Sequence, residues 1–141
     1  LFLLITGGEP LLYPDFKRLY KTLHDMGFIL TLNTNGTLID EKWAIFFKEQ
    51  GIRRVNITLY GTSNETYRKL CHYEDGYERA INAIKLLKKH KVDVKINLML
   101  TRENADEVEQ IEKITGKKFD KIHIVGGGCL YSCAYGTRLD D

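Results

Sequence analysis

The sequence predicts a single α/β domain built on a parallel β-sheet. Segments with the apolar pattern of β-strands alternate along the chain with segments whose apolar residues recur at helical spacing. The strand-like segments end about one βα unit apart, and this spacing selects parallel strands joined by helical crossovers. With 141 residues, the chain has the size of one ordinary domain with its own core. The predicted strand ends are Thr6, Asn33, Thr58, Leu100 and Val125.

The first strand and helix are predicted from the first 27 residues. Residues 1–6 form a continuous apolar run, which predicts a strand covered on both faces. Gly7 begins the turn that stops this strand. Apolar residues at helical spacing between Asp15 and Met26 predict a helix. Gly27 follows at the position where a left-handed residue typically ends a helix.

The same alternation continues to the C-terminal part of the chain. Thr62 and Glu65 have the spacing of a capping box, which predicts the start of a short helix that runs to about Leu70. Strict alternation over 92–100 predicts a strand with one exposed face. The remaining strands are expected at 28–32, 55–60 and 121–125, and the remaining helices at 40–50, 76–91 and 104–115.

Composition excludes several classes of protein. Lys plus Arg number 21 and Asp plus Glu number 19, so the net charge of +2 points neither to nucleic acid nor to a membrane as partner. The apolar runs are too short to span a bilayer. Three cysteines at irregular spacing, without a charged leader segment, predict a reduced, cytoplasmic protein. The chain begins directly on a strand at Leu1, which suggests a fragment of a longer protein.

Loops that follow the carboxyl ends of parallel strands are where ligands bind in such folds. The first of these loops places Gly7, Gly8 and Glu9 at a strand end, where backbone and acceptor groups can approach a ligand, although a plain tight turn explains the same residues. Asn33 to Gly36 offers amides and a hydroxyl, but Asn-Gly is also a common turn. Polar residues within otherwise apolar strands need partners, either a ligand or their own core. They are Thr58, Tyr60, Lys95 and Asn97.

Other motifs fit known sites poorly. The glycines at 126–128 lack the third glycine of a dinucleotide fingerprint, because Tyr131 stands there. Cys129 and Cys133 resemble half of a metal site, but an iron–sulfur cluster needs at least three thiolates and Cys71 is far away in the sequence. The four histidines lack the spacing of a zinc site.

Taken in order, these loops resemble the radical S-adenosylmethionine (radical SAM) superfamily, from Leu3 to about Val125. The segment 5–12, Ile-Thr-Gly-Gly-Glu-Pro-Leu-Leu, is similar to the family's glycine-glycine-glutamate motif, and 34–36 is similar to its threonine-asparagine-glycine turn. The strand at 55–61 and the segment 94–97, followed by Thr101-x-x-Asn104, resemble the next two strands, in the manner of members with a SPASM extension.

The resemblance implies a partial (βα)6 TIM-like barrel, here roughly strands two to six. Residues 1–125 would form the partial core domain, and 126–141 the start of a C-terminal extension or tail. In the family, a CxxxCxxC loop after the first strand holds a [4Fe-4S] cluster. No three cysteines of this chain have that spacing, so the cluster ligands are absent and the isolated chain is expected to be inactive.

For the intact enzyme, the resemblance implies reductive cleavage of S-adenosylmethionine at the cluster, giving a 5′-deoxyadenosyl radical that abstracts a substrate hydrogen. By match to the family, Gly7, Gly8 and Glu9 would hold the methionine ammonium, and Thr58 would contact the ribose. The remaining expected cofactor-binding residues are Thr34, Lys95 and Asn97. His72 and Asp75 stand where relatives usually have glycines, so a cofactor role for that stretch is not carried over.

The substrate is not readable from the sequence. The Thr-Leu-Tyr-Gly and Thr-x-x-Asn variants resemble those of family members that mature peptides or activate other enzymes, so the resemblance implies peptide or protein modification, with a small molecule as the other substrate class. A non-catalytic α/β binding or structural module is the alternative. The apolar strand at 1–5 would have an open edge without strand one of the barrel, so the fragment is expected to form a homodimer.

Overall fold

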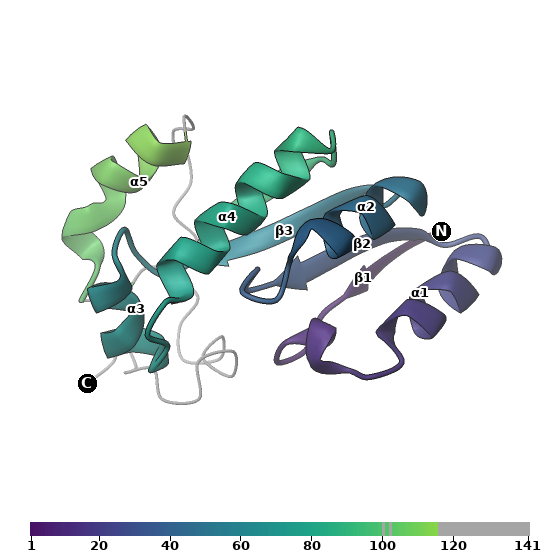
Figure 1. The fold of residues 1–141 in the computed structure, drawn as a ribbon, viewed down its shortest axis with the longest axis horizontal. Helices are drawn as coiled ribbons and strands as arrows, with labels where there is room; N and C mark the ends of the chain where they lie inside the picture. The colour runs from purple at the N-terminus through teal and green to yellow at the C-terminus, as the bar shows by residue number, and fades with distance from the viewer. Residues whose placement is uncertain (100, 102, 116–141) are drawn as a thin grey trace. The chain divides into compact units, whose positions relative to one another are not determined.

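The computed structural model describes residues 1–99, 101 and 103–115. Helices and strands alternate along these residues, as the periodicity predicts (Figure 1). The elements are β1 (Phe2–Ile5), η1 (Pro10–Leu12), α1 (Phe16–Asp25), β2 (Ile29–Thr34), α2 (Glu41–Glu49), β3 (Arg54–Leu59), α3 (Asn64–Cys71), α4 (Gly76–Lys89), β4 (Val94–Leu98), η2 (Ala105–Glu107) and α5 (Val108–Thr115).

The strands form one four-stranded sheet in the order β1-β2-β3-β4. β1 pairs with β2 in parallel, and β2 pairs with β3 in parallel. Sequential strand order with parallel pairing confirms the predicted α/β fold. The expected fifth strand at 121–125 and the expected boundary at residue 125 lie outside the described residues.

The described residues fall into two compact units. The first comprises Leu1–Thr58 and Arg79–Asn97, and the second comprises Leu59–Glu78 and Leu98–Asp141, of which the structure describes residues 59–78, 98, 99, 101 and 103–115. No helix within the described part of the chain is long and apolar enough to cross a membrane.

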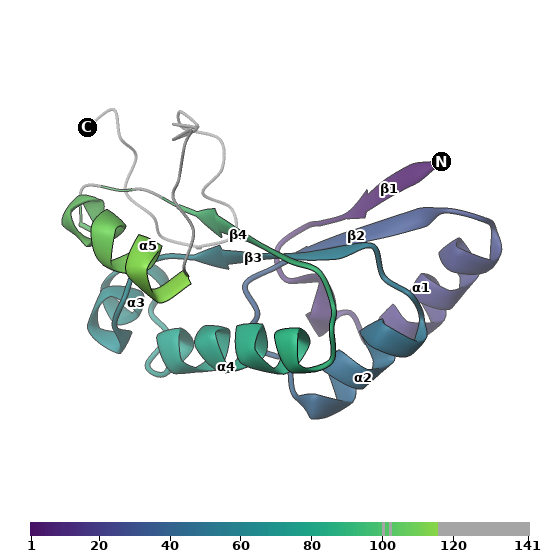
Figure 2. The same ribbon diagram turned by 90° about the horizontal axis from the view of Figure 1, so that it is seen from above.

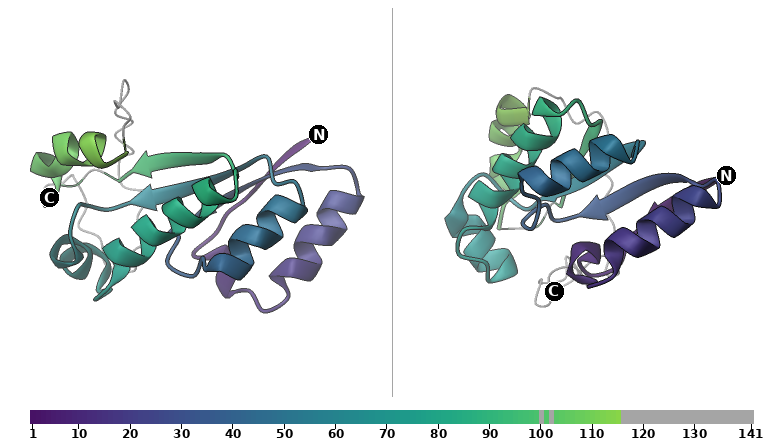
Figure 3. Two further views of the ribbon diagram at one scale, coloured as in Figure 1. Left: turned by 45° about the horizontal axis from the view of Figure 1, so that its top comes forward. Right: turned by 45° about the vertical axis from the view of Figure 1, so that its right-hand side comes forward.

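In the first unit, the helices cover one face of the sheet (Figure 2). The inward side chains of the strands are almost fully buried on that face, for example Leu32 and Val55 at 0% exposure. Aromatic rings fill the layer between α1 and α2, which lie next to each other (Figure 3): Phe16 packs edge-on against Trp43 and Phe47. These contacts explain the helical spacing of apolar residues in the sequence, because α1 and α2 each bury one apolar stripe.

The expectation that the first strand is covered on both faces is wrong. Phe2 is 67% exposed and Leu4 is 49% exposed, because the described helices cover only the opposite face of β1. An apolar run does not distinguish a strand buried on both sides from one whose open face is itself apolar. The alternation predicted for 92–100 is confirmed in β4, where Val94 and Ile96 are buried and Lys95 is exposed.

Helix ends follow local chemistry, with one correction. Gly27 and Gly51 adopt positive φ angles of 88° and 63°, as expected after helix ends. The predicted capping box from Thr62 to Glu65 is not formed. Ser63 is the N-cap of α3, and its side chain accepts a hydrogen bond from the backbone N–H of Thr66. Thr62 instead bonds to Glu107, a partner far along the chain.

Candidate functional site

Glu9 joins the loops that follow β1 and β2. Its Oε1 accepts a hydrogen bond from the Thr34 hydroxyl at 2.8 Å and another from the backbone N–H of Leu11 at 3.1 Å. Its Oε2 accepts the backbone N–H of Asn35 at 2.8 Å. A carboxylate offers about four acceptor positions, so these three bonds leave about one for a further donor.

The loop after β2 is a tight turn held by its own side chains. The Asn35 Oδ1 accepts the backbone N–H of Thr37 at 2.9 Å and its hydroxyl at 2.8 Å, which is an Asx turn. Gly36 has a φ of +78°, and a Cβ there would lie 3.3 Å from the Ile57 Cγ2. Its N–H donates to the Thr34 hydroxyl at 3.1 Å. Thr34 is therefore a buried link between Glu9 and this turn.

Gly7 and Gly8 border open space among the described residues. A Cβ built on either glycine meets no heavy atom within 4 Å. Gly7 has a φ of +155°, which disfavours any side chain, whereas no positive φ constrains Gly8. Packing within the described chain therefore gives no reason for the missing side chain at Gly8, and a close approach by another molecule would give one.

The uncovered face of the sheet is polar toward the strand ends. Asn33 and Asn56 are register partners on β2 and β3. The bonds from Val55 N–H to Asp93 C=O and from Met99 N–H to Leu59 C=O fix β3 against β4. In a parallel ladder, this register places Lys95 beside Asn56 and Asn97 beside Thr58. Three of the residues predicted for the site, Thr58, Lys95 and Asn97, thus share this face with two asparagines.

One atom of this face is left without a partner. The Asn56 Nδ2 donates to the Asn33 Oδ1 at 2.7 Å, but the Asn56 Oδ1 is inaccessible to solvent and has no hydrogen-bond partner among the described residues. An unsatisfied buried polar group costs about 1–3 kcal/mol. Sequence reasoning did not single out Asn56, although an asparagine in the middle of a strand, in phase with Thr58, is a usable signal.

In the second unit, two side chains shape the loop after β3. Asn104 is fully buried, and its Nδ2 donates to the carbonyls of Tyr60 and Met99, each at 2.7 Å. The Glu107 carboxylate accepts hydrogen bonds from the Thr62 N–H and hydroxyl and from the Thr66 hydroxyl. These long-range bonds give the Thr101-x-x-Asn104 motif a structural role.

Close packing at this loop explains its glycine and perturbs a nearby tyrosine. A Cβ at Gly61 would collide with the side chain of Thr66. Burial, and then the charge of Glu107, raise the pKa of Tyr77. His72 has a left-handed φ of 53° at the end of α3, a conformation that glycine adopts without strain.

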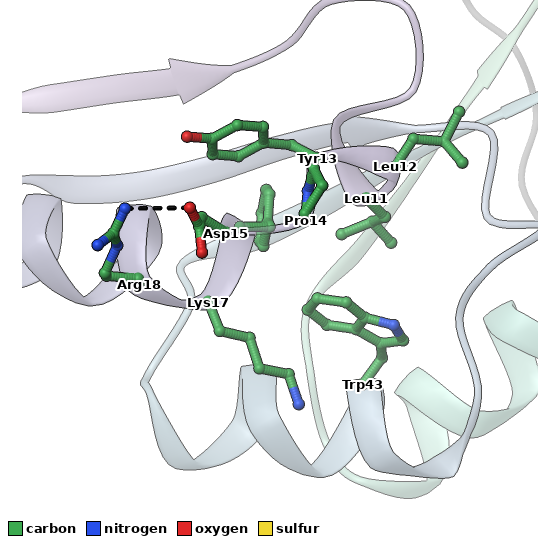
Figure 4. Close-up of a pocket in the computed structure, with 9 residues that line it drawn as sticks. Leu11, Leu12, Tyr13, Pro14, Asp15, Lys17, Arg18 and Trp43 are labelled. Carbon is green, nitrogen blue, oxygen red and sulfur yellow. Dashed lines mark hydrogen bonds and ion pairs between the residues drawn. The ribbon is translucent and has the colours of Figure 1, made fainter.

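A surface pocket lies at the start of α1, between η1 and Trp43 of α2 (Figure 4). Lys17 extends over the ring of Trp43, with its Nζ 4.9 Å from the ring centroid. Arg18 pairs with Asp15 at 3.0 Å. Both cations of the pocket are therefore engaged, and none of the residues predicted for the site lines it. The strand ends remain the candidate site.

The described residues contain no group of three or more His, Cys, Asp or Glu side chains that could hold a metal ion. Of the three cysteines, Cys71 is half-buried in α3, while Cys129 and Cys133 lie outside the described residues. Because the sequence also lacks three cysteines at cluster spacing, the residues of this chain do not fit a [4Fe-4S] cluster.

Comparisons with known proteins agree with the fold. Residues 2–114 match the family model described as the Radical SAM superfamily. The chain is 30% identical over 112 residues to an AdoMet-dependent heme synthase of Oleidesulfovibrio alaskensis, covering 79% of this chain and 29% of that protein. It is 32% identical over 124 residues to a probable GTP 3',8-cyclase of Saccharolobus islandicus, covering 86% of this chain and 40% of that protein.

Solved structures give the same result. "Native anSMEcpe with bound AdoMet and Kp18Cys peptide" superposes with a TM-score of 0.67 at 26% identity, over 84% of this chain and 36% of that one. The Streptococcus suis protein SuiB bound to S-adenosylmethionine has a TM-score of 0.69 at 18% identity, over 80% of this chain and 26% of that one, which shows the fold alone. The chain thus spans well under half the length of these proteins.

Proposed function

Since this chain belongs to the radical SAM superfamily, we propose that its strand-end loops bind S-adenosylmethionine as part of a longer enzyme. The observation that carries the proposal is the open surface beside Gly7 and Gly8, where a side chain would meet nothing in the described chain. A bound molecule that touches the backbone there explains Gly8, whereas the φ of Gly7 already disfavours a side chain. AdoMet bound to the related anSMEcpe supports the same choice of ligand.

The residues present fit the polar end of that cofactor. We assign the methionine ammonium to the carbonyls of the Gly7-Gly8 segment and to the acceptor position that Glu9 has left. Thr34 acts by orienting the Glu9 carboxylate, because its own hydroxyl is already engaged on both sides. S-adenosylmethionine supplies a sulfonium whose carbon–sulfur bond breaks on one-electron reduction.

The other expected contacts lie on the uncovered face. Thr58 is assigned to the ribose, as the family resemblance implies, and its half-buried position at the end of β3 is compatible with this contact. Lys95 and Asn97 are assigned to the cofactor from the neighbouring strand β4. Hydroxyl, ammonium and amide groups in this arrangement orient a neutral sugar and an anionic carboxylate.

The [4Fe-4S] cluster belongs, on this proposal, to a part of the longer protein that this chain does not include. The chain spans 29% of the heme synthase and 40% of the cyclase. Anaerobic reconstitution of this chain with iron and sulfide should therefore leave no stable cluster. Roughly four irons per chain, lost on mutation of Cys129 or Cys133, would contradict this assignment.

For the intact enzyme we propose a peptide substrate and a SPASM-type extension, with a small molecule as the second possibility. The peptide bound to anSMEcpe supports the first, and the names of the heme synthase and cyclase support the second. The apolar part of the uncovered face favours a peptide, because Phe2, Leu4 and Ile29 expose surface suited to apolar side chains.

An NMR titration of the full chain with S-adenosylhomocysteine tests the cofactor site. We expect the backbone amide signals of Gly7 and Gly8 to shift, and we expect Gly8→Val to abolish binding without lowering the melting temperature. Gly27→Ala is the control, since Gly27 also borders open space but lies after α1. Equal binding by the wild type and Gly8→Val would show that the loop is only a turn.

A further inference from the structure

The asparagine pair on β2 and β3 is not explained by the stability of the sheet. Asn33 and Asn56 face each other across neighbouring strands, and one hydrogen bond of 2.7 Å joins them. The Asn56 Oδ1 is buried without a partner. Two apolar side chains at these positions would avoid the unsatisfied acceptor, and asparagine is disfavoured in strands.

Asn33 provides a hydrogen-bond donor next to the unpartnered acceptor of Asn56. Its Oδ1 is engaged by Asn56, while its Nδ2 has no hydrogen-bond partner among the described residues. The pair therefore holds one free donor group and one free acceptor side by side. Both are neutral. Arg54 on β3 is already paired with Asp93 at 2.6 Å, and the cation beside the pair on β4 is the exposed Lys95.

From this geometry we propose that the Asn33–Asn56 pair recognises a neutral group of the bound ligand, one that both donates and accepts a hydrogen bond. An amide of a peptide substrate and a ribose hydroxyl of the cofactor have this chemistry. The proposal rests on the function proposed above, because it assigns the choice of ligand group to residues on the same face of the sheet. The amide groups of the pair carry no charge, and an anionic ligand group would instead be drawn to Lys95 beside it.

Binding requires a small movement of Asn56. Water does not reach its Oδ1, so the amide must turn about the Cβ–Cγ bond, a torsion with a broad energy well. The turn exchanges the bond to Asn33 for a bond to the ligand. Exposed Lys95 stands beside Asn56 in the register and is long enough to move aside.

The test is an NMR titration of the full chain in two arms. One arm uses S-adenosylhomocysteine, and the other uses N-acetylglycinamide, a neutral molecule with two amide groups. We expect the side-chain NH₂ signals of Asn33 and Asn56 to shift in at least one arm, and the arm that responds identifies whether the cofactor or a substrate amide is the source.

Variants separate recognition from structure. Asn56→Leu removes the unsatisfied acceptor, so we expect an unchanged or higher melting temperature together with at least tenfold weaker binding in the responding arm. Asn56→Asp keeps an acceptor at the same place and should bind. Gly8→Val leaves the asparagine pair intact. If this variant loses binding of S-adenosylhomocysteine but still responds to N-acetylglycinamide, the cofactor site at Gly8 and the site at the asparagine pair are separate.

Three outcomes would overturn the proposal. One is the absence of a shift at both asparagines with either probe. Another is wild-type affinity in Asn56→Leu. The last is a lowered melting temperature in Asn56→Leu, which would make the pair a structural element of the sheet.

Discussion

Replacing Glu9 should loosen the junction of two loops, and the structure gives the size of the effect. The carboxylate accepts three hydrogen bonds, from Leu11, Thr34 and Asn35. Hydrogen bonds to a charged group contribute about 1.5–3 kcal/mol each. Glu9 is only half-buried, so water replaces part of what is lost. We expect Glu9→Ala to lower the free energy of unfolding by about 2–4 kcal/mol, a large part of the ~5–15 kcal/mol typical of a domain.

Glu9→Gln gives a graded test. An amide retains one acceptor oxygen, which can keep the bonds from Leu11 and Thr34, but its NH₂ group then faces the N–H of Asn35. Losing that one bond should cost about 1–2 kcal/mol. Asp15→Ala is the control, because the Asp15–Arg18 pair is exposed and such a pair contributes about 0–1 kcal/mol.

Urea unfolding followed by circular dichroism measures these differences, with the slope of the transition checked for constancy. Hydrogen exchange at the Asn35 amide provides a local readout, since this amide should lose protection in both Glu9 variants. A Glu9→Ala variant within about 0.5 kcal/mol of the wild type, with Asn35 still protected, would refute the role of Glu9 as a clamp.

Three further predictions concern the rest of the described chain. Lys91 and Gly51 both follow a helix with a positive φ, 58° and 63° respectively. In thermal unfolding, Lys91→Gly should therefore raise stability by about 0.5–1 kcal/mol, and Gly51→Ala should lower it by a similar amount. Effects of the same sign in the two variants would contradict this. Burial raises the pKa of Tyr20 to about 12. Because the unfolded chain ionises first, the free energy of unfolding should be full below pH 10 and fall between about pH 10 and 12. Tyr20→Phe should remove this loss without lowering stability at pH 7. We also predict that the chain self-associates through the edge strand β1, whose Leu4 is 49% exposed; sedimentation should show a dimer that Leu4→Lys converts to a monomer, and a monomeric wild type at high concentration would contradict it.

Local sequence patterns were sufficient for the α-helices and β-strands of the described residues and for their order, but not for the short turns η1 and η2. Helical spacing of apolar residues located α1 and α2, and strict alternation located β4 together with its exposed face at Lys95. Gly27 identified the end of α1 because its backbone conformation, with a φ of 88°, is disfavoured for other residues. These signals are short-range, so a single sequence contains them in full.

Contacts between distant residues could not be derived in the same way. Thr62 satisfies the pattern of a capping box, yet it bonds to Glu107, which lies 45 residues away. Glu9 was expected to bind a ligand, and its carboxylate also accepts a hydrogen bond from Thr34. The orphaned acceptor of Asn56 depends on the register of β2 against β3, which local patterns do not specify.

The central claim is that the loop at Gly7 and Gly8 binds the methionine end of S-adenosylmethionine. A crystal structure of the chain with S-adenosylmethionine would test this most directly. We predict that the cofactor's amino group lies within about 3.2 Å of a backbone carbonyl of Gly7 or Gly8 or of the Glu9 carboxylate, which is hydrogen-bonding distance. Cofactor bound at the surface pocket beside Trp43, with the strand-end loops untouched, would contradict the claim.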